Sequence, residues 1–311
     1  EGKFYFKGSG GLVLQSYRHR TALRIAKSAI LSVTTLALLG CMASERKEPT
    51  TFGPTIVSLN PCSDAVLAKV TRPGQLLAVS HFSHEVGGSS MGVAEGRRYP
   101  AVSGSVEEIA RISPDIVVAD VFLPPATEQA IRDLGIRVVT IGNINSVADS
   151  LLQVRQLSEV SRNIDKGQLL VRDIEDAILK FSSVLQAEAK PISAIVWQSG
   201  GIVAGDNTLI AELLRLSGFF NAAAVRGMRQ ADYLPLEVML AHPPEVIFAA
   251  GEEASQEDRL LSHPALSALK DTRRVAFDSA LLWCGGPTII RALEELSQVR
   301  RELSAERQKV G

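Results

Sequence analysis

Short apolar runs alternate with helical patterns along most of the chain. Between them, in segments such as 64–70, 127–135 and 211–218, apolar residues recur at helical spacing, and Gly218 is placed to end the last of these helices. Strands that alternate with helices predict an α/β fold with largely parallel sheets. The apolar, β-branched runs that predict the strands lie at 55–60, 76–80, 116–119, 138–142, 194–198, 246–249 and 275–277.

Two segments that lie 130 residues apart follow the same pattern. Residues 105–119 read SVEEIARISPDIVVA, and residues 235–249 read PLEVMLAHPPEVIFA. In each segment a short amphipathic helix is followed by a proline, an acidic residue and an apolar strand, and Glu107 aligns with Glu237. The constant offset favours a duplicated lobe over two unrelated helix–strand units, which are common in α/β proteins.

The region between the two copies predicts long helices. Apolar residues recur at helical spacing over 146–161 and 163–188, which contain little glycine and no proline. A helix of about 25 residues is roughly 37 Å long, which is enough to join two lobes rigidly. We therefore expect an N-terminal lobe over 55–161, a connecting helix over 162–190 and a C-terminal lobe over 191–306.

The first 40 residues have the features of an export signal. They contain six Lys or Arg and one acidic residue, and an apolar run over 29–39 is too short to span a membrane comfortably. The sequence Leu-Leu-Gly-Cys at 38–41 resembles a bacterial lipobox, with a plain secretory signal as the alternative. We expect a signal peptide over 1–40, a linker over 41–54, and a periplasmic protein that a lipid on Cys41 anchors to a membrane without spanning it.

Composition and motifs exclude several classes of function. The formal net charge is −1, so no basic excess is available to neutralise nucleic-acid phosphates. The sequence has no Walker loop, no GxSxG or CxxC motif, and no GxGxxG after a predicted strand. We therefore expect neither a nucleic-acid partner nor an enzyme.

Several segments together resemble one family of transport proteins. IVSLNPCSDAVLAKV, LLAVSHFSHE, SVEEIARISPDIVVAD and TEQAIRDLGIRVVTIG resemble the first lobe of the substrate-binding proteins of cobalamin and iron–siderophore ABC importers. GGIVAGDNTLIAELLRLSGFFNAA, LPLEVMLAHPPEVIF and HPALSALKDTRRVAF resemble the second lobe. The resemblance covers about residues 54–305. It implies two Rossmann-like lobes joined by a rigid helix, and no cofactor of the protein's own.

The resemblance also implies a ligand and a partner. The ligand is a metal chelate (a corrinoid, a ferric siderophore or heme) held between the lobes and delivered to a permease dimer with its ATPase. Glu107 and Glu237, one on each lobe, are implied to dock on arginines of the two permease subunits. The alternative for both residues is a favourable interaction with a helix dipole. Two departures, Thr288 where arginine often follows Gly-Pro and the lack of a cysteine pair within the second lobe, argue against cobalamin itself.

The expected ligand site follows from the positions of the strand ends. Ligands of α/β proteins bind beyond the carboxyl ends of strands, and large aromatic rings suit a bulky chelate, although core packing is the alternative for each tryptophan. Arg97, Arg98, Arg226 and Arg229 could reach an anionic siderophore or form solvated surfaces. The residues expected to bind the ligand are Asn60, Pro61, Cys62, His81, Phe82, His84, Asp120, Trp197, Trp283 and Cys284, with Phe122 and Gln198 beside them.

Two other function classes remain open at this stage. His81 and His84, with Cys62 and Cys284, could hold a bare zinc or manganese ion, and one histidine could instead ligate the metal of a chelate. An enzyme on the same fold could use Asp64, His81 and Asp120 as acid–base groups. The resemblance puts the two cysteines on opposite lobes, so we expect free thiols. A disulfide, which an oxidising compartment permits, would hold the cleft shut.

Overall fold

The computed structural model describes residues 53–183, 191–251 and 263–310. The predicted signal peptide, Cys41 and most of the predicted linker lie outside these residues. Within them, no helix is both long enough and apolar enough to cross a membrane.

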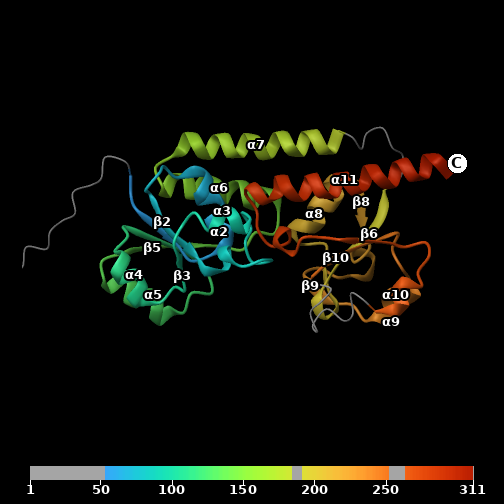
Figure 1. The fold of residues 1–311 in the computed structure, drawn as a ribbon, viewed down its shortest axis with the longest axis horizontal. Helices are drawn as coiled ribbons and strands as arrows, with labels where there is room; N and C mark the ends of the chain where they lie inside the picture. The colour runs from blue at the N-terminus through green and yellow to red at the C-terminus, as the bar shows by residue number, and fades with distance from the viewer. Residues whose placement is uncertain (1–52, 184–190, 252–262, 311) are drawn as a thin grey trace, which may run out of the picture. The chain divides into compact units, whose positions relative to one another are not determined.

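Two sheets form the framework, one in each half of the chain (Figure 1). The first is entirely parallel, with the order β3-β2-β1-β4-β5, and the second has the order β11-β10-β6-β7-β9, with β8 beside β6. Only the pairings of β7 with β6 and β9 are antiparallel, so the prediction of mainly parallel sheets is confirmed. The strands are β1 (Ile56–Ser58), β2 (Leu76–Ser80), β3 (Ala101–Val102), β4 (Ile116–Asp120), β5 (Arg137–Ile141), β6 (Ile192–Gln198), β7 (Ile202–Ala204), β8 (Phe219–Asn221), β9 (Ala231–Tyr233), β10 (Val246–Ala250) and β11 (Arg273–Ala276).

Helices lie between most of the strands, as the alternating pattern predicts. Gly218 ends α8 with a φ of 79°, a conformation that favours glycine. The α-helices are α2 (Pro61–Val70), α3 (Val93–Gly96), α4 (Val106–Ile112), α5 (Pro125–Asp133), α6 (Val147–Val160), α7 (Ile164–Ser183), α8 (Leu209–Leu216), α9 (Leu236–Ala241), α10 (Pro264–Ser267) and α11 (Pro287–Val310). Short 3₁₀ helices occur at η2 (His81–His84), η4 (Ser199–Gly201), η5 (Ala224–Arg226) and η7 (Ser279–Leu281).

The two copies of the sequence repeat fold alike. The helix α4 and the strand β4 begin 130 residues before α9 and β10, respectively. The acidic residue before each strand also makes equivalent hydrogen bonds. The carboxylate of Asp115 accepts the Thr55 N–H at 2.7 Å, and that of Glu245 accepts the Ser193 N–H at 3.1 Å. In return, the hydroxyls of Thr55 and Ser193 accept the N–H groups of Asp115 and Glu245.

Along each strand, successive side chains point to opposite faces of the sheet, and each face packs against a different layer of helices. Ile116 of β4 and Phe248 of β10 belong to the largest core cluster, to which α2, α6, α7, α8 and α11 contribute. On the opposite faces, Ile109 of α4 packs with the first sheet and Met239 of α9 packs with the second. The helices α4 and α9 therefore lie on the sides of their sheets away from α7, as Figure 1 also shows.

The helix α7 joins the two halves of the described chain. It packs along α6 and α11, and its buried side includes Leu170, Ile174 and Phe181. Asn163, just before the helix, is buried and donates a side-chain hydrogen bond of 2.8 Å to Gln75. This contact ties the start of α7 to the first lobe.

Candidate functional site

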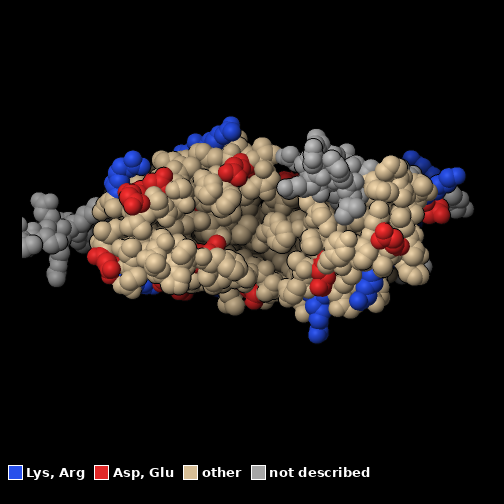
Figure 2. Space-filling model, turned by 90° about the horizontal axis from the view of Figure 1, so that it is seen from below, with Lys and Arg blue, Asp and Glu red and all other residues tan. Residues whose placement is uncertain are grey.

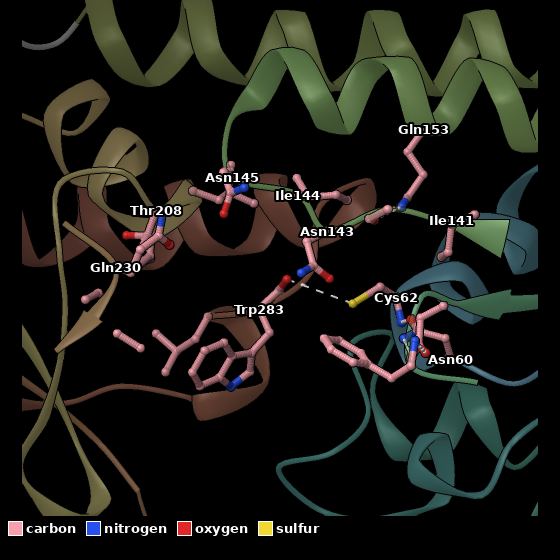
Figure 3. Close-up of a pocket in the computed structure, with 18 of the residues that line it drawn as sticks. Asn60, Cys62, Ile141, Asn143, Ile144, Asn145, Gln153, Thr208, Gln230 and Trp283 are labelled. Carbon is pink, nitrogen blue, oxygen red and sulfur yellow. Dashed lines mark hydrogen bonds between the residues drawn. The ribbon is translucent and has the colours of Figure 1, made fainter. Parts of the chain in front are cut away.

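A cavity of about 320 Å³ opens at the carboxyl ends of strands from both sheets (Figures 2 and 3). In Figure 3, Asn60 and Cys62 lie on one side of it, and Thr208, Gln230 and Trp283 lie on the other. Its lining residues are Asn60, Cys62, Asp120, Phe122, Ile141, Gly142, Asn143, Ile144, Asn145, Gln153, Gln198, Ala204, Thr208, Leu209, Ile210, Gln230, Ala231, Leu282 and Trp283.

The first lobe contributes a fixed polar wall. Asn60 caps α2 by accepting the Cys62 N–H at 2.8 Å, and its side-chain N–H₂ donates to Asp120 at 2.8 Å. The second carboxylate oxygen of Asp120 accepts the Phe122 N–H at 2.8 Å. The structure thus brings together Asn60 and Asp120, which the sequence selected from two different strand ends. The Phe122 ring, which is 73% exposed, lies beside them.

The second lobe contributes Trp283, which follows η7 and has 58% of its surface exposed. The Cys62 Sγ lies 3.9 Å from the Trp283 carbonyl oxygen, and the dashed line in Figure 3 joins these two atoms. The indole is therefore held at the boundary between the lobes with its ring open to the cavity and to solvent.

Cys62 and Cys284 form a disulfide with a Cα–Cα distance of 4.9 Å, so the expectation of two free thiols is wrong. The expectation assumed that the two loops face each other across an open cleft. Instead, the loop after Trp283 reaches the first lobe. Gly286 donates its N–H to Ser150 at 2.7 Å, and a Cβ on Gly285 would lie 2.4 Å from the Ser150 hydroxyl oxygen. Glycine is required for this close approach.

Further contacts extend this junction along the start of α11. Thr288 is fully buried and donates its hydroxyl to the Ser90 carbonyl at 3.2 Å, and Arg291 donates to the same oxygen at 2.9 Å. Thr288 therefore joins the lobes and does not line the cavity.

The prediction that Trp197 contacts the ligand is wrong. Trp197 is fully buried and packs in a core cluster with Ile247 and Met239. Successive residues of a strand point to opposite faces. The side chain of Trp197 faces the core on the α9 side of the sheet, whereas Gln198, the next residue, lines the cavity.

Five other expected ligand-binding residues lie outside the cavity lining: Pro61, His81, Phe82, His84 and the buried Cys284. Pro61 begins α2, the two histidines and Phe82 lie in η2, and Cys284 is bonded to Cys62. The His84 Nε2 lies 3.2 Å and 3.0 Å from the carbonyl oxygens of Gly96 and Tyr99, so this nitrogen carries the proton and donates. Nowhere in the described residues do three or more His, Cys, Asp or Glu side chains group to hold a metal ion, so the bare-ion site finds no support there.

Sequence reasoning missed part of the polar lining. Asn143 and Asn145 follow β5, so the strand-end rule that selected Asn60 would have found them. Gln153 lies within α6, and nothing in its local pattern distinguishes it from other polar helix residues. Thr208 is the N-cap of α8, and this capping role gives it a structural explanation that hides its place in the cavity.

Asp64, a candidate acid–base group of the enzyme alternative, lies inside the first lobe. It is fully buried on α2, and its carboxyl accepts the Ser80 N–H at 2.9 Å and the Ser83 hydroxyl at 2.7 Å. Burial raises the pKa of Asp64 to about 8, although these hydrogen bonds oppose the rise. The group joins α2 to the end of β2 and does not line the cavity.

This pKa predicts that stability falls as the pH rises from 5 to 8. In that range the folded protein keeps the Asp64 proton, whereas the unfolded chain, with a pKa near 3.8, releases it. Each pH unit then costs up to about 1.4 kcal/mol. Asp64→Asn should remove this slope, so its free energy of unfolding relative to wild type should rise by about 2–4 kcal/mol between pH 5 and 8. Urea denaturation measures the difference. The exposed Asp133→Asn is the control, and parallel profiles for Asp64→Asn and wild type would contradict the prediction.

Comparison with known proteins gives consistent matches. The sequence model of a family described as periplasmic binding proteins matches residues 56–281. The uncharacterized ABC transporter substrate-binding lipoprotein YvrC of Bacillus subtilis is 22% identical over 303 residues, which cover 87% of this chain and 95% of YvrC.

Solved structures show the same fold. The periplasmic heme-binding protein HutB of Vibrio cholerae has a TM-score of 0.66 and 20% identity, covering 79% of this chain and 98% of HutB. The heme-binding protein RhuT of Roseiflexus sp. RS-1 has a TM-score of 0.64 and 21% identity, covering 79% of this chain and 97% of RhuT. The vitamin B12-binding protein BtuF of Vibrio cholerae has a TM-score of 0.61 and 20% identity, covering 79% of this chain and 96% of BtuF. These matches confirm the fold class and the family resemblance expected from the sequence.

Proposed function

Because the chain belongs to the periplasmic binding protein family, we propose that it is the substrate-binding component of an ABC importer. It binds a metal chelate, such as a corrinoid, a ferric siderophore or heme, and delivers it to a permease dimer with its ATPase. The observation that carries the proposal is the open cavity built from strand ends of both lobes, with the exposed rings of Phe122 and Trp283 at its edge. The description of YvrC as an ABC transporter substrate-binding protein supports the partner, and the heme- and vitamin B12-binding roles of HutB, RhuT and BtuF support this class of ligand.

The two aromatic rings suit the flat face of a chelate. Ligand sites are mainly apolar clefts in which a few polar groups fix the orientation of the ligand. Phe122 comes from the first lobe and Trp283 from the second, so a planar ligand between them would contact both lobes at once. Stacking on an aromatic ring contributes about 0.5–1.5 kcal/mol beyond the buried area.

Tryptophan fluorescence tests this proposal directly. The chain has two tryptophans, of which Trp197 is buried in the core and Trp283 borders the cavity. A bound chelate should therefore quench mainly Trp283, and Trp283→Ala should weaken binding about tenfold in calorimetry, which corresponds to about 1.4 kcal/mol. Phe220→Ala removes an exposed ring of the same lobe outside the cavity and is the matched control. Tight binding of zinc or manganese ions without any response to chelates would contradict the proposal and favour the bare-ion alternative.

The proposal includes export and a lipid anchor. Residues 1–40 act as the signal peptide, residues 41–54 as the linker, and an acylated Cys41 holds the mature protein at a membrane on its periplasmic side. The Leu-Leu-Gly-Cys sequence supports this assignment, as does the description of YvrC as a lipoprotein. An intact mass of the detergent-extracted protein that lacks the diacylglyceryl increment on Cys41 would contradict it.

A further inference from the structure

The polar side chains of the cavity are mostly carboxamides. Six of its lining residues are Asn or Gln, and Thr208 adds a hydroxyl. A carboxamide both donates and accepts hydrogen bonds but carries no charge. The amides come from both lobes, since Asn143 follows β5 and Gln198 ends β6. The six are Asn60, Asn143, Asn145, Gln153, Gln198 and Gln230.

The oxygen of one of these amides lacks a hydrogen-bond partner among the described residues. Gln153 has only 7% of its surface exposed, and its Nε2 donates to the Gly142 carbonyl at 3.4 Å. Because a carbonyl oxygen can only accept, this contact identifies the nitrogen end of the amide. The remaining Oε1 is buried without a partner among the described residues. In Figure 3, Gln153 extends from α6 toward the loop that lines the cavity. A buried acceptor without a partner is costly, and an N–H or O–H group of a ligand would satisfy it.

The only charged side chain among the described lining residues is acidic. Asp120 carries a carboxylate, and the cavity lining has no Lys, Arg or His in the described part of the chain. The four arginines considered for an anionic ligand lie elsewhere. For example, the Arg226 guanidinium donates to the carbonyls of Ala222 and His242. On the face shown in Figure 2, Lys and Arg side chains lie away from the hollow between the lobes.

This lining fits poorly with heme, although heme-binding proteins are among the similar structures. Heme iron is held by His, Cys, Met or Tyr side chains. The described lining contains none of these except Cys62, whose sulfur is bonded to Cys284. The described lining also offers no basic partner for the two heme propionates, and the Asp120 carboxylate disfavours their negative charge in a partly desolvated site.

We infer that this site, given the proposed function, selects chelates without net negative charge whose edges carry amide or similar hydrogen-bonding groups. The amides of the cavity pair with such groups as donors and acceptors, and Gln153 accepts from one of them. Asp120 favours a positively charged ligand and disfavours an anionic one. A corrinoid with amidated side chains has this chemistry, and so does a ferric hydroxamate siderophore of neutral or positive charge.

Four probes of different charge distinguish the alternatives. Aquacobinamide and ferrioxamine B are cationic, and they represent the corrinoid and the hydroxamate source, respectively. Heme and ferric enterobactin are anionic. In calorimetry at physiological salt, one cationic probe should bind at least 100-fold more tightly than either anionic probe. If an anionic probe binds as tightly as the cationic ones or more tightly, the charge inference fails and the proposed function stands. If none of the four binds, the proposed function fails as well.

Two variants test the residues that carry the inference. Asp120→Asn should weaken binding of the preferred cationic probe about five- to tenfold, because a single favourable charge is removed. The ratio of the affinity for this probe to the affinity for heme should fall as well. Gln153→Leu should weaken that probe at least fivefold with little change in the free energy of unfolding. It removes a buried acceptor that has no partner among the described residues, and the one hydrogen bond that it loses, to Gly142, is long at 3.4 Å. Asp133→Asn, an exposed change outside the cavity, is the control for charge. Unchanged affinities in both cavity variants would overturn the inference.

Discussion

Removal of the Cys62–Cys284 disulfide should lower the free energy of unfolding by about 2–4 kcal/mol. The bond joins residues separated by 222 positions in sequence, so it restricts the unfolded chain strongly. Urea denaturation of the Cys62→Ser/Cys284→Ser variant against the oxidised wild type measures the effect. The variant should still fold, because Gly286 and Thr288 keep their own hydrogen bonds to the first lobe.

Reduction provides the control for this prediction. Wild-type protein treated with dithiothreitol should unfold at the urea concentration of the double variant, whereas the same treatment should not change the variant. A titration of the untreated mature protein that finds two reactive thiols, together with no effect of dithiothreitol, would show that the bond does not form.

The disulfide illustrates where sequence reasoning ends for this chain. The family resemblance places the two cysteines on opposite lobes; in the structure Cys62 lies on α2 and Cys284 follows η7. Their contact depends on the loop after Trp283, which crosses to the first lobe. Gly285 has no side chain to clash with Ser150, and Gly286, which donates to Ser150, has none to clash with Val66. Such an approach depends on tertiary packing, and no spacing or periodicity in the sequence encodes it.

Strand periodicity explains both a success and a failure at the site. The buried parallel strands are continuous apolar runs, so β2 and β4 could be placed from sequence alone. The same continuity gives no indication of the face of the sheet to which each side chain points. Trp197 and Gln198 are adjacent at the end of β6, and only the structure shows that the glutamine, not the tryptophan, reaches the cavity.

The sequence pattern could predict neither the shortest strands nor the site residue that lies on a helix. β7 and β9 have three residues each and pair antiparallel, which is too short for a periodic pattern. Gln153 lines the cavity from α6 because this helix packs beside the end of β5. The strand-end rule selects loops, so it cannot identify such a residue.

Glu107 and Glu237, the pair that we propose to dock on the permease, occupy equivalent positions in the sequence repeat. Each lies in the first turn of its helix, α4 or α9, and is exposed. Neither has a hydrogen bond or ion pair among the described residues, whereas the neighbouring Glu108 accepts hydrogen bonds from Ser103. Their helices occupy equivalent positions in the two lobes, on the sheet faces away from α7. Two free carboxylates at repeated positions suit two similar permease subunits.

Glu107→Ala combined with Glu237→Ala should reduce uptake of the transported chelate at least tenfold, and more than either single change. Arginine–carboxylate pairs are strong and specific hydrogen-bonded contacts, so losing both should weaken permease association by several kcal/mol. Ligand affinity should stay within about twofold of wild type, since neither residue lines the cavity. Asp173→Ala with Asp176→Ala removes the same charge from the exposed side of α7 and should leave uptake unchanged. Normal uptake by the glutamate double variant would exclude this docking surface, whereas equal losses in both double variants would point to net charge rather than position.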